Sequence, residues 1–320
     1  MALFGAALIV FIIWHADISW KRFAGALSSA DPLLLAAAFV MTFVIFCAGA
    51  LKWRWIVRVT SPASRCSVAQ LLYFTVLGNV IGLFVPQNLG MLGTRGLALS
   101  RCAEMPLARS FYSVVVDALF DFFILGIFAI PAFMVVGGWL APLPGMIVAV
   151  GLLVSCYIAC KAFPSFALGC IIKTWELLAR IGSKLPFKKP LFPYEPNSTP
   201  PFYDHAVIGW VYLGSYAKFL LLILRTYIVI RAFGLDVSPE VIYFTLPASI
   251  LLTAVAATPG GLGVQDAGWY GLLLLQGVSP ENAALIIVLQ RAFSFLAVIA
   301  MLPLAWLINW RVEKMGLTTA

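Results

Sequence analysis

The chain has 320 residues, of which 62% are hydrophobic and only 11% are charged, and it carries a formal net charge of +8. A soluble core of this size cannot bury so much apolar surface, so the composition excludes a soluble globular protein and indicates an integral membrane protein. The net charge does not indicate nucleic-acid binding, because the basic residues cluster beside hydrophobic segments, as they do on the cytoplasmic side of membrane proteins.

The first two apolar segments differ in length. Residues 1–14 are short for a span, and we expect there either a shallow, tilted helix or a chain whose true start lies upstream of Met1. Residues 32–51 are long enough to cross the membrane. The basic residues that follow them mark the cytoplasmic side: Lys52, Arg54, Arg58 and Arg65.

The next apolar stretch, residues 68–85, has basic residues beyond both of its ends, which a single crossing does not explain. We therefore expect residues 68–108 to form a two-limbed hairpin that enters from the cytoplasm, turns at 85–90 and returns. Pro86 and Gly90 favour a turn at that place, because proline interrupts a helix and glycine tolerates the unusual backbone angles of a turn.

Two spans are expected at residues 110–134 and 144–163, joined by an uncharged external loop. The central loop, residues 164–204, carries an excess of lysine and arginine, which predicts a cytoplasmic position. Its first part has the pattern of an amphipathic helix, which would either bind anionic lipid headgroups or pack against the bundle. Its second part is rich in proline and is expected to be irregular.

The last third of the chain contains two more spans and a second two-limbed element. A span is expected at residues 206–230, the two-limbed element at 241–277 and the last span at 281–309, followed by Arg311 and Lys314. These basic residues predict a cytoplasmic carboxyl terminus, in a multi-pass protein of the cytoplasmic (inner) membrane.

The two turns share the pattern P-x-x-L-G, at residues 86–90 and 259–263. Each lies at the tip of a hairpin between two spans, and the charge bias makes one hairpin enter from the cytoplasm and the other from outside. We therefore predict an all-α polytopic membrane protein that forms a single domain over residues 1–320. It would contain an inverted-topology repeat, residues 31–134 and 206–310, with two re-entrant or broken-helix hairpins.

The tips of the two hairpins are expected to meet near the middle of the membrane. A helix that restarts after such a turn directs free N–H groups and the positive end of its dipole toward the tip, where an anion such as a lipid phosphate would bind. The alternative is a kink that serves packing alone.

Ionisable side chains within spans usually face a partner or a polar cavity, because their burial costs free energy. Asp117 and Asp121 lie four residues apart, and Lys218 and Arg225 lie seven apart, so each pair occupies one helix face. We expect the two faces to pair across the bundle. A purely structural network of salt bridges is the alternative to a functional one.

Arg291 lies about three turns into the last span, and Asp266 is its expected partner, because a helix dipole favours a carboxylate in the first turn. Arg95 is expected to play the corresponding role after the first turn. The predicted substrate-binding residues are Pro86, Gly90, Arg95, Pro259, Gly260, Gly261, Gly263, Asp266 and Arg291.

The six cysteines are scattered without a CxxC pair, and the chain has two histidines, His15 and His205. We expect neither a disulfide framework nor a metal site, and no cofactor. No acid–base group accompanies either histidine in the sequence, so an enzyme is not expected.

Four features together resemble one known family: a Trp53-Arg54 pair near an early span, a proline–glycine turn followed by Arg95, the segment PGGLGVQD, and Leu289-Gln290-Arg291 in the last span. They are similar to the flippase-like family that includes the membrane domain of lysylphosphatidylglycerol synthases, over nearly the whole chain. The resemblance implies a domain that moves lipids across the bilayer, lysyl-phosphatidylglycerol in the fused synthases, where a separate soluble domain performs the aminoacyl transfer.

The sequence departs from that family pattern at three places. Met91-Leu92-Gly93 stands where an acid is common, Asp266 stands where a glutamate is common, and Asp117-Ala118 stands where Asp-Arg is often found. These departures bear on which lipid the protein would carry.

The expected function is a stand-alone lipid transporter, or flippase, that moves an anionic or modified phospholipid or a lipid-linked substrate across the cytoplasmic membrane. Its expected partners are membrane lipids with anionic headgroups. Two alternatives remain: an integral membrane transferase that acts on lipid-linked substrates, and a non-transporting scaffold for enzymes of lipid or glycan synthesis.

Overall fold

The computed structural model describes residues 20–62, 64, 66–163, 205–253 and 258–315, and the single residues 169, 173 and 177. The described part of the chain folds into ten α-helices with one isolated β-bridge. The segment expected at 1–14 and nearly all of the central loop expected at 164–204 lie outside the described residues.

Five of the described helices are long and apolar enough to cross a membrane: α3 (Pro32–Thr60), α6 (Leu107–Val136), α7 (Pro142–Ala162), α9 (His205–Ala232) and α12 (Pro280–Lys314). They coincide with the five long spans expected from the sequence. The protein is therefore a helical, multi-pass membrane protein.

Four other helices are shorter than the roughly 20 residues that cross a bilayer. They contain 17, 16, 15 and 12 residues: α4 (Val68–Phe84), α5 (Gln87–Cys102), α10 (Pro239–Thr253) and α11 (Val264–Leu275). They form two consecutive pairs, α4–α5 and α10–α11, at the places where the sequence predicts two-limbed elements. A still shorter helix, α2 (Trp20–Ser28), precedes α3.

Local sequence explains where two of these helices begin. Asp31 accepts hydrogen bonds from two backbone N–H groups in the first turn of α3, and Pro32 occupies the first helical position, where its missing N–H costs nothing. Ser67 and Gln70 form a reciprocal capping box at the start of α4. Both helices therefore start at residues whose side chains replace the missing helical hydrogen bonds.

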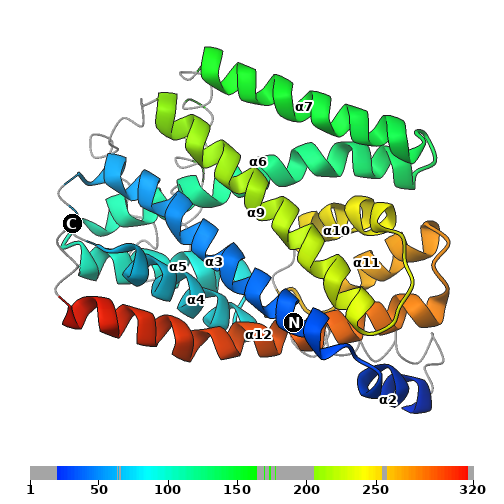
Figure 1. Cartoon of the computed structure of the whole chain (residues 1–320). Coiled ribbons are helices and arrows are strands. Elements are labelled where there is room, and N and C mark those ends of the chain that lie inside the picture. The colour runs from blue at the N-terminus through cyan, green and yellow to red at the C-terminus, as the bar shows by residue number, and fades with distance from the viewer. Residues whose placement is uncertain are drawn as a thin grey trace.

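The long helices α3 and α9 run antiparallel and pack along most of their length. The backbone N–H of Asp31, at the start of α3, donates to the carbonyl of Ala232, at the end of α9, over 2.7 Å. Figure 1 places the α4–α5 pair in the left half of the view and the α10–α11 pair in the right half, with α12 running past both. Helix α12 packs on α4, and α6 packs on α10.

Helix α3 is longer than the span expected at 32–51, and this corrects one expectation. Lys52 and Arg54 lie within the helix, and Lys52 is buried in the protein instead of marking a cytoplasmic surface. Trp53 beside it is fully buried. The residue after Leu51 meets polar partners on two neighbouring helices, because Lys52 pairs with Asp117 and Asp121 of α6 and donates to a serine of α9.

The α4–α5 pair is an antiparallel helical hairpin that turns at Val85 and Pro86. The two helices approach closely at Gly90, where an added Cβ would lie 2.8 Å from the backbone Cα and N of Gly82. No larger residue fits there without a backbone shift. The two-limbed arrangement expected at 68–108 is therefore present.

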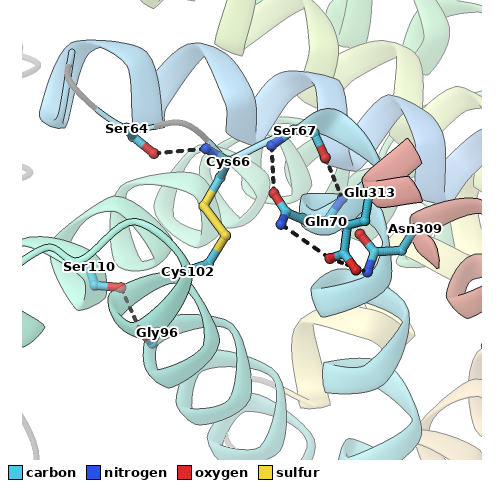
Figure 2. The surroundings of a disulfide bond; sticks show 9 residues. All are labelled: Ser64, Cys66, Ser67, Gln70, Gly96, Cys102, Ser110, Asn309 and Glu313. Carbon is cyan, nitrogen blue, oxygen red and sulfur yellow. Dashed lines mark hydrogen bonds between the residues drawn. A yellow bond between two sulfur atoms is a disulfide. The ribbon is translucent and has the colours of Figure 1, made fainter. Parts of the chain in front are cut away.

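At the opposite end of this hairpin, Cys66 and Cys102 form a disulfide, with their Cα atoms 6.3 Å apart (Figure 2). The expectation of no disulfide was wrong. The two cysteines are 36 residues apart in sequence, and only the return of α5 alongside α4 brings them together. Gln70 Nε2 donates to Glu313 Oε1 over 3.4 Å, which joins the start of α4 to the end of α12 (Figure 2).

The disulfide predicts a specific pattern of thiol labelling. Alkylation of the denatured, non-reduced protein is expected to modify Cys47, which has a free thiol, and to leave Cys66 and Cys102 unmodified. Digestion and mass spectrometry should then recover the peptides of Cys66 and Cys102 as one linked species. Full alkylation of Cys66 without reduction would contradict the cross-link.

Candidate functional site

The two P-x-x-L-G turns are in direct contact. Pro86 and Pro259 form an antiparallel β-bridge. The N–H of Gly260 donates to the carbonyl of Gly82 over 2.9 Å and, less closely, to that of Val85 over 3.4 Å. The expected contact between the two turns is therefore present, with the N–H of Gly260 as the donor.

The glycines of the second turn have a conformational reason to be there. Gly260, Gly261 and Gly263 have φ angles of +57°, +70° and +83°, in the left-handed region that residues with a Cβ rarely adopt. Gly260 also lies against the backbone of Leu83, whose carbonyl oxygen would be 3.6 Å from a Cβ at this position. The segment is glycine-rich because it reverses direction against a neighbouring backbone.

Arg291 and Asp266 form the ion pair that the sequence predicts. Arg291 Nη2 lies 2.6 Å from Asp266 Oδ2, and Arg291 Nη1 donates to the carbonyl of Gly260 over 2.8 Å. Asp266 Oδ2 also accepts from the N–H of Gly263, at the start of α11, over 2.9 Å. The Arg291 side chain, 27% exposed, therefore holds the second turn and the start of α11 together and remains partly accessible.

Arg95 lies differently from what we expected. Its Nη2 is 2.8 Å from Asp117 Oδ2, and its guanidinium carbon lies 4.0 Å from the centre of the Trp53 ring. The residue is 3% exposed. Arg95 therefore contacts α6 and α3, and it does not bind the first turn in the way that Arg291 binds the second.

The two carboxylates of α6, buried Asp117 and partly buried Asp121, each bind two cations. Lys52 Nζ lies 2.9 Å from Asp117 Oδ1 and 2.6 Å from Asp121 Oδ1, and Asp121 also pairs with Lys218. Lys52 Nζ further donates to Ser215 Oγ over 2.9 Å. The expected pairing of α6 with α9 is thus confirmed for Lys218 and Asp121, and Lys52 is the member that sequence reasoning missed.

Arg225 was expected to join this network, and that expectation was wrong. Its Nη2 donates to Ser294 Oγ of α12 over 3.2 Å, and no carboxylate of the described residues pairs with it. The guanidinium is nevertheless buried. Among the described residues, the interior therefore holds more cations than carboxylates: Lys52, Arg95, Lys218, Arg225 and Arg291 against Asp117, Asp121 and Asp266.

The ten helices of the described residues, five of them long and apolar, define a polytopic membrane protein in which two turns touch and several charged side chains are buried. The sequence matches the family described as Lysylphosphatidylglycerol synthase TM region over residues 2–301. The chain belongs to this family.

Two curated relatives carry no activity in their names. A UPF0104 membrane protein of Methanothermobacter thermautotrophicus is 25% identical over 92% of this chain and 89% of its own length. A second match to a UPF0104 membrane protein of the same organism is 30% identical, over 29% of this chain and 28% of the relative. The first likeness extends over nearly the whole fold.

The closeness of α4 and α5 predicts opposite outcomes for two glycines of α5. Gly90→Ala places a Cβ against the Gly82 backbone and is expected to lower the free energy of unfolding by about 1–3 kcal/mol. Gly93→Ala meets nothing within 4 Å and is the matched control, expected to leave the melting temperature in detergent unchanged or slightly raised. Equal melting temperatures would contradict the close packing.

Asp117 is predicted to be essential for stability, because it neutralises two buried cations. Asp117→Asn leaves Lys52 and Arg95 short of a negative charge and is expected to cost about 3–5 kcal/mol. Asp236→Asn removes a carboxylate from the exposed pair with Arg231 and should change stability little. Thermal unfolding of the purified variants would measure both, and equal losses would contradict the assigned network.

Proposed function

We propose that the protein is a lipid transporter that moves an anionic or modified phospholipid, or a lipid-linked substrate, across the cytoplasmic membrane. The observation that carries the proposal is the contact between two helix interruptions inside a bundle of apolar spans. Membership of the Lysylphosphatidylglycerol synthase TM region family supports a role in lipid handling.

We infer that the chain is an inverted-topology repeat. The order long helix, short pair, long helix occurs twice, as α3, α4–α5, α6 and as α9, α10–α11, α12. The packing supports this, because α12 lies on the first short pair and α6 lies on the second. Exchanging the halves therefore exchanges these contacts, as a two-fold relation between repeats requires.

We infer further that the two short pairs are re-entrant. Helices of 17 and 15 residues are about 26 and 23 Å long, less than the roughly 30 Å hydrocarbon core. The pairs lie toward opposite ends of the long helices in Figure 1 and touch at their tips. Such a pair reaches the middle of the membrane from one side and returns to that side.

The distribution of basic residues favours one orientation. Arg58, Arg101, Lys161 and Arg311 lie near helix ends that share one face with the disulfide. By the positive-inside rule we infer that this face, and with it the carboxyl terminus, lies in the cytoplasm. A disulfide on that face would be exposed to cytosolic reductants, so its state in cells would report on the same orientation.

The chemistry of the centre favours a negatively charged headgroup. Helix α5 begins at Gln87, and its N-cap residue Pro86 has no side chain that accepts from the first N–H groups. The positive end of the helix dipole points at the contact between the turns. Arg291, partly exposed, lies at the same contact, and buried cations exceed buried carboxylates among the described residues. We infer that the headgroup binds there while the halves move around it.

A vesicle assay tests the proposal. Reconstituted wild-type protein is expected to accelerate movement of a fluorescent phosphatidylglycerol between leaflets, read as headgroup accessibility to an external quencher. Arg291→Ala should slow this at least about tenfold, because a charged hydrogen-bonded partner is lost. Arg311→Ala removes an exposed arginine from the end of the same helix and serves as the control.

The outcomes separate the claims. Equal rates for wild type and Arg291→Ala would refute the role of that residue, and the absence of protein-dependent movement would refute transport. Mass spectrometry of the recovered lipid would detect a changed headgroup, the sign of transferase activity.

A further inference from the structure

Arg225 is a buried cation that pairs with no carboxylate of the described residues. It lies about two turns before the end of α9, and the residue is only 8% exposed. Among the described residues its one polar contact is Ser294 Oγ of α12, and its Nε has no hydrogen-bond partner. A guanidinium left so incomplete in a membrane-spanning helix carries a large cost unless something else completes it.

Gln290, one residue before Arg291 on α12, lies in the same place and also has an unsatisfied hydrogen-bonding atom. Its Nε2 donates to Thr226 Oγ1 over 3.3 Å and to Ser294 Oγ over 3.4 Å, while its buried Oε1 has no partner. Arg225 and Gln290 therefore reach the same hydroxyl, from α9 and α12. The seam between these helices holds a cation, a hydroxyl and a free acceptor within a few ångströms.

The chain does not supply an anion for this seam from its described buried carboxylates. Asp117 is paired with Lys52 and Arg95, Asp121 with Lys52 and Lys218, and Asp266 with Arg291. Among the described residues Arg225 is therefore left without a counter-charge, which a bound anion would supply.

We propose that Arg225, Ser294 and Gln290 bind the phosphate of a phospholipid headgroup in the seam between α9 and α12. The planar guanidinium matches two phosphate oxygens, and the Ser294 hydroxyl donates to a third. Gln290 Oε1 accepts from a hydroxyl or ammonium group beside the phosphate, so the ligand is a phospholipid with a donor in its headgroup. The choice of a lipid over free phosphate rests on the proposed function.

The surroundings suit acyl chains. Leu224, next to Arg225, is 49% exposed, and Leu296, two residues after Ser294, is 67% exposed. Both are apolar side chains on the outer surface of membrane-spanning helices, where hydrocarbon covers them. A lipid whose headgroup entered the seam would leave its acyl chains outside the seam, in the hydrocarbon around the membrane-spanning helices.

The binding test uses the full-length, delipidated protein in detergent, with binding read by native mass spectrometry. The probes are dihexanoyl-phosphatidylglycerol, dihexanoylglycerol without phosphate, and inorganic phosphate. Wild type should bind the phospholipid at least about tenfold more tightly than Arg225→Gln, which loses a charged hydrogen-bond donor. Arg231→Gln, in an exposed pair on the same helix, should bind as wild type does.

Stability separates a ligand site from a structural arginine. Because Arg225 lacks a counter-charge, Arg225→Met should leave the melting temperature of the lipid-free protein unchanged or raise it, while weakening phospholipid binding. Gln290→Ala tests the acceptor and should weaken binding of phosphatidylglycerol more than that of phosphatidic acid, whose headgroup lacks the glycerol donors.

Each outcome decides the matter. Unchanged phospholipid binding in Arg225→Gln, or loss of binding together with a lower melting temperature in Arg225→Met, overturns the proposal. Binding of inorganic phosphate as tight as that of phospholipid overturns the lipid assignment. Arg225-dependent binding in a protein that moves no lipid between leaflets would refute the proposed transport function and leave this site standing.

Discussion

In hydrocarbon a backbone N–H or C=O without a partner costs several kcal/mol, so a helix can be interrupted only where other groups complete its hydrogen bonds. Here two helix interruptions contact each other and share backbone hydrogen bonds. The N–H of Gly260 reaches the carbonyl of Gly82, the two prolines form a bridge, and Arg291 takes the carbonyl of Gly260. This contact fixes the relative position of the short pairs, and through them that of α12 and α6, which pack on them.

The buried charges stabilise the two sides of the bundle unequally. Around α6, each aspartate binds two cations, so α3, α5 and α9 are tied to one helix by ion pairs. Between α9 and α12, Arg225 is held by a single hydroxyl. Helices joined by complete ion pairs resist separation. The contact between α9 and α12, where Arg225 has no counter-ion among the described residues, depends on what binds to it. The first side is suited to hold the fold, and the second to respond to a ligand.

Much of the fold could be predicted from the sequence, because long apolar runs indicate membrane spans, and proline with glycine indicates both turns. The pair Arg291–Asp266 could be predicted as well, since a deep arginine needs a carboxylate and the start of a helix favours one. Lys52 could not, because a lysine after an apolar run looks like an anchor at the membrane surface until α3 is seen to continue to Thr60.

The partners of Arg95 and Cys66 could not be predicted from the sequence, for a related reason. The partners of Arg95 are Asp117 and Trp53, and the partner of Cys66 is Cys102, so each contact depends on how α5 lies against α4 and α6. Spacing along one helix predicts which side chains share a face. It does not predict which neighbouring helix that face meets.

The single bridge between Pro86 and Pro259 has a mechanical meaning. Only Val85 and Pro86 lie between α4 and α5, so the pairing cannot extend into a ladder, and the contact stays at one bridge with Gly260 as its donor. Each hydrogen bond of this kind contributes about 0.5–1.5 kcal/mol. A contact made of so few hydrogen bonds satisfies backbone groups at rest and can still break and re-form by thermal motion.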